Sequence, residues 1–312
     1  KYSVPSGYLA LCAANLPAPG IDPAADEAPT DYFNTVLYTG TGATQSITGV
    51  GFQPDWVWLK TRSGTTNHQL FDSVRGVNKS LVSNATGAED TSSTNKLTSF
   101  DSDGFSLGDH ATPNTSSSTY VAWSWKAGGT AVSNTDGSIT SSVSASPESG
   151  FSVVTYSGTS NSNATVGHGL GVAPTMVIVK PRTEARHWLI WHTAFNDNDK
   201  ALLFDDEVPA DARFGPNAPT ASVFGVYGGQ GNRTGTDFVA YCFTDIDGMV
   251  KAGSYVGNGS SDGPMVFTGF RPAFVMFKNI TTIGGHWVIY DAVRDTFNPV
   301  DSWLNPKRRT CT

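Results

Sequence analysis

Short apolar runs of strand length, rather than helical stripes, hold most of the hydrophobic residues of the chain. Three of these runs, DWVWL, TMVIV and AFVMF, directly follow Pro54, Pro174 and Pro272. Proline fixes φ and lacks a backbone donor, so it stands at the starts of strands rather than in their middles. The runs are almost continuously apolar, which is typical of strands covered on both faces. The pattern therefore predicts three equivalent buried strands.

The surroundings of these runs are also alike, which predicts internal repeats. A lysine stands six positions after each proline, at Lys60, Lys180 and Lys278, and we expect it to end the burial of the strand. A second apolar run then opens, and its first residues are His68, Trp188 and Trp287. The loops between the two runs are polar, so each pair of runs predicts two neighbouring strands.

A second shared element sets the length of the repeat. The run YVAWSWKAGG (Tyr120–Gly129) matches FVAYCFTDIDG (Phe238–Gly248), so a full unit is about 100–120 residues long. The third unit stops at Thr312 before it reaches this element. The expected division is residues 1–30 (the end of an upstream β domain plus a proline-rich linker), 31–130 (repeat 1), 131–250 (repeat 2) and 251–312 (partial repeat 3).

Each full unit has the size and the turn signals of one antiparallel β-sandwich, so the expected fold class is all-β with tandem sandwich repeats. One lone strand is expected at Tyr8–Ala13, before the linker, and at most one weak helical stretch, around Phe71–Leu81.

Composition and charge exclude several classes of protein. Charged residues are 15% of the chain, aromatic residues 11% and hydrophobic residues 38%, which argues against disorder. Only five glutamates occur, which disfavours a helical protein. The net charge of -7 gives no broad basic surface for nucleic acid. No apolar run reaches the roughly 18–20 residues that span a bilayer, so we expect no membrane insertion.

Candidate chemistry is sparse, and we expect no enzymatic activity, no cofactor and no metal. No G-x-S-x-G nucleophile elbow is present. Four histidines lie at or near the openings of apolar strands, where a structural role is expected: His68, His187, His192 and His286. Carboxylates recur near turns and strand ends, and none stands out as one of a catalytic pair: Glu89, Glu148, Glu207, Asp72, Asp205, Asp206 and Asp291.

The remaining polar motifs favour structural interpretations. The sequences DSDG (Asp101–Gly104) and DIDG (Asp245–Gly248) resemble fragments of a calcium loop but lack its full arrangement, so we interpret them as turns. The cysteines Cys12, Cys242 and Cys311 are too few and too scattered for a disulfide framework. Cys12 and Cys242 lie in apolar runs and are expected to be small buried residues.

The tryptophans allow two interpretations. They are Trp56, Trp58, Trp123, Trp125, Trp188, Trp191, Trp287 and Trp303. Pairs at i and i+2 can form the stacking platform of a carbohydrate-binding sandwich, but most of these rings recur at repeat-equivalent positions, which favours a core. If one binds sugar, it should lack an equivalent in the other repeats, and Trp303 is that weak candidate.

Several of these strings resemble a known group of proteins. PSGYLALCAANLPAP, near the N-terminus, resembles the end of the SPRY/concanavalin-like domain of large tailed-phage virion proteins. GFQPDWVWLKTRS, LTSFDSDGFSLG, YVAWSWKAGG and GHGLGVAPTMVIVKPR resemble the tandem repeats that follow that domain. The resemblance covers essentially the whole chain and maps no catalytic residue onto it.

The resemblance implies a virion structural protein with concanavalin- or jelly-roll-like, lectin-like sandwiches, exposed on the particle surface as a tail fibre or similar appendage. Its expected partners are other virion proteins and a host-surface glycan. The alternatives are a capsid decoration or head-fibre protein, and a carbohydrate-binding module of a polysaccharide-degrading enzyme.

The two ends of the chain lead to an expectation about assembly. An unpaired strand edge invites pairing with another chain, and the partial third repeat offers one. We therefore expect a homo-oligomer, most simply the trimer that the resemblance suggests. The alternative is that further residues of the same polypeptide complete the third sandwich and leave a monomer.

Overall fold

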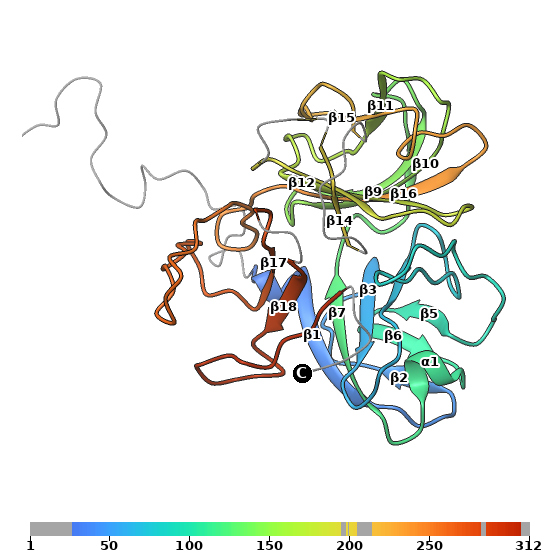
Figure 1. Cartoon of the computed structure of the whole chain (residues 1–312). Helices are drawn as coiled ribbons and strands as arrows, with labels where there is room; N and C mark the ends of the chain where they lie inside the picture. The colour runs from blue at the N-terminus through green and yellow to red at the C-terminus, as the bar shows by residue number, and fades with distance from the viewer. Residues whose placement is uncertain (1–26, 195–197, 199, 205–213, 282–284, 307–312) are drawn as a thin grey trace, which may run out of the picture.

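The computed structural model describes residues 27–194, 198, 200–204, 214–281 and 285–306. Almost all of its regular structure is antiparallel strand, which confirms the all-β sandwich fold class (Figure 1). The helices of the described residues are two short ones, η3 (Pro29–Asp31) and α1 (Ala111–Asn114). The strand expected at Tyr8–Ala13 lies outside the described residues.

The first repeat is a sandwich of one large and one small sheet. The large sheet has the order β1 (Phe33–Thr39), β7 (Thr119–Trp125), β3 (Trp56–Thr61) and β4 (Gln69–Asp72). The small sheet has the order β2 (Gln45–Ile47), β6 (Gly104–Leu107) and β5 (Leu97–Asp101). The stretch around Phe71–Leu81, the one place where the sequence allows a weak helix, is not helical: β4 covers its first residues, and the Asp72 carboxylate then accepts from the Arg75 backbone N–H in a turn.

The second repeat has the same strand order with additions at both edges. Its large sheet contains β10 (Phe151–Ser157), β16 (Asp237–Phe243), β12 (Met176–Pro181) and β13 (Leu189–His192) in that order. The additions are β14 (Leu202–Leu203) beyond β13, and β9 (Ser141–Ser146) and β8 (Val132–Asn134) beyond β10. Its small sheet pairs β11 (Ala164–Gly167) with β15 (Val223–Val226).

The third repeat contributes one pair of strands, β17 (Phe274–Lys278) and β18 (Trp287–Asp291). These correspond to β3 with β4 and to β12 with β13, since Trp56 opposes Asp72, Met176 opposes His192 and Phe274 opposes Asp291. The pair lies beside β1 and β7, and the ring of Phe274 is 5.8 Å from that of Phe33 (Figure 1).

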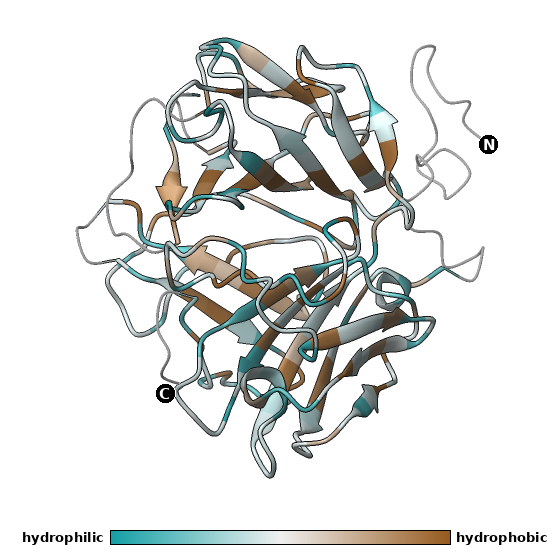
Figure 2. Cartoon of the chain, turned by 90° about the vertical axis from the view of Figure 1, so that its right-hand side faces the viewer, coloured by the Kyte–Doolittle hydropathy of each residue, from teal (hydrophilic) through white to brown (hydrophobic). Residues whose placement is uncertain are grey.

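Strand alternation gives each repeat two hydrophobic faces. In β3, Val57 and Leu59 face the small sheet of their own repeat, whereas Trp56 and Trp58 enter a core that residues from all three repeats share. In β12, Val177 faces the small sheet of the second repeat. Apolar residues concentrate in the strands and polar ones in the loops, as Figure 2 shows. The predicted coverage of these strands on both faces is confirmed for β3 and β12.

Lys60 and Lys180 lie within β3 and β12 and do not end the burial, so that expectation is wrong for these two lysines. Lys60 is 1% exposed and Lys180 is 0% exposed. The Lys60 ammonium donates to the carbonyl oxygens of Thr61 (2.8 Å) and Gly64 (3.3 Å), and the Lys278 ammonium donates to that of Gly285 (2.6 Å). A lysine stem is aliphatic, and loop carbonyls replace the water that its ammonium loses.

Candidate functional site

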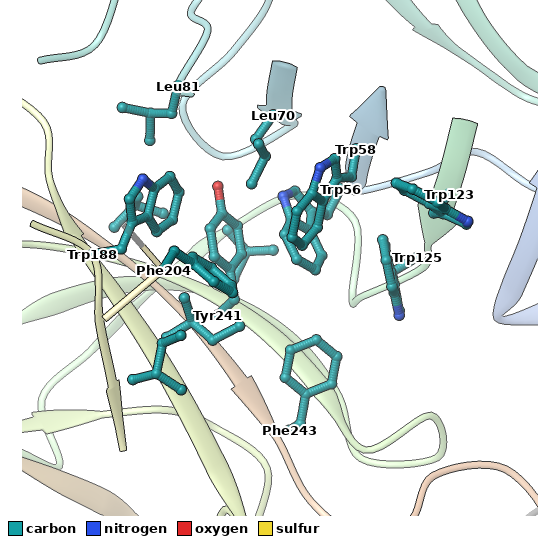
Figure 3. Close-up of a cluster of buried hydrophobic side chains, with 14 of the residues drawn as sticks. Trp56, Trp58, Leu70, Leu81, Trp123, Trp125, Trp188, Phe204, Tyr241 and Phe243 are labelled. Carbon is teal, nitrogen blue, oxygen red and sulfur yellow. The ribbon is translucent and has the colours of Figure 1, made fainter. Parts of the chain in front are cut away.

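The shared core is the feature that joins the three repeats. In Figure 3 the rings of Trp188, Tyr241 and Trp56 form a row. Trp56 of the first repeat stacks on Tyr241 of the second, with ring centroids 4.3 Å apart. Phe204 of the second repeat contacts Trp287 of the third at 5.3 Å. Aromatic pairs of this kind contribute beyond the area that they bury, so this core binds the repeats to one another.

A first set of polar contacts connects the repeats in a ring. The Trp188 indole N–H of the second repeat donates to the Val82 carbonyl of the first (2.8 Å). The Trp287 indole N–H of the third repeat donates to the Leu203 carbonyl of the second (2.9 Å).

The first repeat closes this circuit of contacts, and it does so through His68, which stands at the position of Trp188 and Trp287. Its Nε2 lies 3.1 Å from the Asn305 carbonyl of the third repeat, and its Nδ1 accepts from the Trp58 indole N–H (2.8 Å). Nδ1 is therefore unprotonated, and in a neutral ring Nε2 carries the proton and donates. From donor to acceptor, the three contacts run from repeat 2 to 1, from 3 to 2 and from 1 to 3. The three repeats of this chain are therefore related by a pseudo-threefold arrangement.

The three accepting carbonyls occupy equivalent places. Each belongs to the residue after a leucine that pairs with the strand of its own repeat: Leu81 with Leu70, Leu202 with Ile190, and Leu304 with Ile289. The same local structure thus recurs three times around the core.

A second set of contacts comes from an Asp-x-x-Arg sequence, found in the first and third repeats. Asp72 and Asp291 are 0% and 2% exposed. Each carboxylate accepts from the backbone N–H and from the guanidinium Nε of the arginine three residues on, Arg75 or Arg294.

Each of these aspartates also holds an aromatic residue of the next repeat. The Tyr241 hydroxyl donates to Asp72 (2.7 Å), and the Trp123 indole N–H donates to Asp291 (3.0 Å). Counted from donor to acceptor, as in the first set, these contacts run from repeat 2 to 1 and from repeat 1 to 3. The equivalent residue of the second repeat is His192, whose Nδ1 accepts from the Ala194 backbone N–H (2.9 Å).

A buried ion-pair network reinforces the contact between the first and second repeats. Arg75 donates to Glu89 (2.8 Å), and Arg182 of the second repeat forms two hydrogen bonds of 3.0 Å to the same carboxylate. Burial opposes the charge of Arg75, but Asp72, Tyr241 and Glu89 outweigh it and raise the pKa of Arg75. Burial likewise opposes the charge of Glu89, but the hydrogen bonds and charges of both arginines lower the pKa of Glu89.

This network predicts a loss of stability in acid. Because the folded-state pKa of Glu89 lies below its ordinary value of 4.5, its contribution is complete above that value and declines as the pH falls through the lowered pKa. Denaturant unfolding between pH 7 and pH 3 should show a smaller decline for Glu89→Gln than for the unmodified chain. Identical pH dependence of the two proteins would contradict this assignment.

Several of the described histidines hydrogen-bond to other parts of the chain. His68 joins two repeats, and His187 and His286 immediately precede Trp188 and Trp287. Two histidines from turns use Nδ1 to accept from a nearby backbone N–H: His110 from Thr112 and His168 from Leu170.

The acidic turns also have structural partners. The Asp103 carboxylate accepts from the backbone N–H groups of Gly49 (3.1 Å) and Gly51 (2.6 Å), which fixes the loop beside β2. Among the described residues, no cluster of three or more His, Cys, Asp or Glu side chains could hold a metal ion. Asp205, Asp206 and Glu207 lie outside the described residues.

Most tryptophans are core residues, as predicted. All except Trp303 are buried, and Trp188 and Trp287 are 0% and 4% exposed at equivalent places. Trp303 is half-buried, and its equivalents one position before Leu81 and Leu202 are Ser80 and Ala201.

Cys242 is buried as predicted, and burial raises the pKa of its thiol to about 12. Cys12 and Cys311 lie outside the described residues. No helix of the described residues has the length and apolar character needed to cross a membrane.

The ring of contacts could not be read from the sequence. Asp72 and Tyr241 are 169 positions apart, and no local pattern pairs them. The signal that was present is the recurrence of FDSVR and YDAVR at equivalent places in the first and third repeats.

Comparison with known proteins identifies the family of this chain and no individual relative. No curated protein and no solved structure matches it. The chain belongs to the family described as "Domain of unknown function (DUF7483)", whose sequence pattern matches residues 28–311.

Proposed function

We propose that this chain is a non-enzymatic structural protein of a phage particle, exposed on the virion as a tail fibre or similar appendage that contributes to host attachment. The observation that supports a structural role is the use of the recurring polar residues. His68, Trp188, Asp72 and Asp291 all bond across repeats rather than lining a reactive cleft. The phage assignment is supported by the resemblance of the repeat strings.

The position on the particle is testable by imaging. Gold-labelled antibodies raised against the purified chain should mark the tail appendages of intact virions in electron micrographs. Labelling of the head would favour the capsid decoration or head-fibre alternative. Absence of label from particles, together with the protein in the soluble fraction of infected cells, would contradict a virion role.

A carbohydrate-binding role has one specific observation in its favour. Trp303 is the one tryptophan of the described residues that is half-buried rather than buried, and no aromatic residue replaces it in the other two repeats. An indole with an accessible face can stack on a sugar ring. Binding to host-surface glycans should therefore weaken in Trp303→Ala, while the melting temperature stays close to that of the parent.

Two outcomes of the glycan experiment would redirect the proposal. Unchanged glycan binding by Trp303→Ala would remove this residue from the attachment surface. Release of oligosaccharides from the glycan would favour a polysaccharide-degrading enzyme instead.

We propose in addition that the protein acts as a homo-oligomer, with a trimer suggested by the resemblance. Light scattering on the purified chain tests this, and a stable monomer at micromolar concentration would contradict it.

A further inference from the structure

The strand β17 has an open edge where its equivalents have a neighbour. In the first repeat β3 lies between β7 and β4, and in the second β12 lies between β16 and β13. Within the described residues, β17 pairs with β18 alone. A strand edge of this kind can accept a further strand through its row of backbone N–H and C=O groups.

The side chains of β17 are correspondingly exposed. Val275 is 39% exposed, whereas its equivalents Val57 and Val177 are both 0% exposed. Phe274 and Met276 lie at the margin of the shared core and are half-buried. The equivalent of Met276 in the first repeat, Trp58, is buried.

Exposed apolar residues gather in this repeat. Nine of the twelve large hydrophobic residues that are exposed among the described residues belong to it: Tyr255, Val256, Met265, Val266, Phe267, Val275, Ile280, Val293 and Phe297. Such a concentration marks an interaction surface rather than ordinary scatter.

An open cavity of about 1160 Å³ adjoins the same edge. Side chains from all three repeats line it, including Phe33, Phe243, Phe274, Met276 and His192. The cavity thus lies against the aromatic core. In the first and second repeats, the aromatic side chains of β7 and β16 occupy the corresponding place beside β3 and β12.

His192 identifies which aromatic residue would fit. It is the equivalent of Asp72 and Asp291, which each accept a hydrogen bond from the middle aromatic residue of a β7-type strand, Tyr241 or Trp123. Asp72 contacts the second repeat and Asp291 contacts the first. The third contact of this kind would join His192 to a strand of the third repeat that is equivalent to β7 and β16.

The imidazole of His192 differs from an aspartate in its hydrogen bonding. Its Nδ1 accepts from the Ala194 backbone N–H, so in the neutral ring Nε2 carries the proton and is a donor. Burial lowers the pKa of His192, which favours the neutral ring. A donor requires an acceptor: the tyrosine hydroxyl provides one, whereas the indole N–H of tryptophan does not.

We propose that the open edge of β17 binds a β-strand of the repeat's own type, with the sequence aromatic-Val-Ala-Tyr-polar-aromatic. By the register of β12 with β16, the strand runs antiparallel to β17, with its last aromatic residue opposite Phe274 and its tyrosine opposite Met276. The tyrosine hydroxyl accepts from His192 Nε2, and the two aromatic rings fill the cavity beside the shared core.

A synthetic peptide tests this proposal on the full chain. The probe has the sequence of residues 237–244 with serine in place of Cys242, one lysine added at each end and a fluorescent label. We expect saturable binding by fluorescence anisotropy and slower hydrogen exchange of backbone amides in β17. The control peptide has the same composition in scrambled order.

Two substitutions test the specificity. In the unmodified chain at pH 7.5, replacing the peptide's tyrosine by tryptophan should weaken binding about tenfold, the equivalent of one hydrogen bond. His192→Asp should abolish this preference, because aspartate accepts from either residue. This change introduces the residue found at the equivalent places of the other repeats.

Three results would overturn the proposal. Equal binding of the scrambled peptide would show a nonspecific apolar surface. Binding without protection of the β17 amides would place the peptide elsewhere. Light scattering that shows a dimer, with β17 protected before any peptide is added, would assign this edge to a second copy of the chain.

Discussion

Replacement of Arg75 by leucine should destabilise the folded chain by about 3–5 kcal/mol, because it leaves the buried Asp72 carboxylate without its cationic partner and removes one of the two arginines that bind Glu89. The Arg75 and Asp72 side chains are both 0% exposed, and that of Glu89 is 7% exposed. Arg75 also donates to the backbone carbonyls of Leu70 (3.1 Å) and Lys79 (3.0 Å), which would lose these bonds. Denaturant unfolding at pH 7 measures the difference.

Arg186→Leu provides the matched control for this prediction. Arg186 forms an ion pair with Glu184, but the two side chains are 26% and 33% exposed. A pair in contact with solvent contributes about 0–1 kcal/mol, so this variant should unfold close to the parent. Similar small effects of both substitutions would show that the Arg75 network does not hold the first two repeats together.

Replacement of Trp188 by alanine should cost about 3–5 kcal/mol, since it opens a cavity in the shared core. The residue is 0% exposed, contacts Phe204 at a centroid distance of 5.7 Å and donates to the Val82 carbonyl. Thermal and denaturant unfolding both measure this loss.

Two further variants separate the causes of the loss. Trp188→Phe keeps an aromatic ring and removes the hydrogen bond between repeats, so it should cost clearly less than alanine. Trp303→Ala changes a half-buried ring outside this core and should leave stability nearly unchanged. A Trp188→Ala protein as stable as its parent would contradict the role of Trp188 in joining the repeats.

The sequence predicted the strands of the repeats well because their signals are local. Pro54, Pro174 and Pro272 each precede a buried or half-buried strand, and burial of Trp188 and Trp287 followed from their recurrence. The burial of Lys60 and Lys180 could not be predicted. The sequence does not show whether a lysine ammonium will bind loop carbonyls or water.

The arrangement of the repeats around one core could not be predicted, for a physical reason. Alternation shows that a strand has two apolar faces but does not identify what covers each face. Trp56 could have packed within its own sandwich, whereas it stacks on Tyr241 of the next repeat. Contacts between distant segments depend on shape and on single polar groups, which leave no periodic signal.

The central claim is that the repeats form one structural unit around a shared core, and differential scanning calorimetry tests it most directly. A shared core predicts a single unfolding transition whose calorimetric enthalpy equals its van't Hoff enthalpy. Separate transitions for the repeats, with a calorimetric enthalpy well above the van't Hoff value, would contradict it.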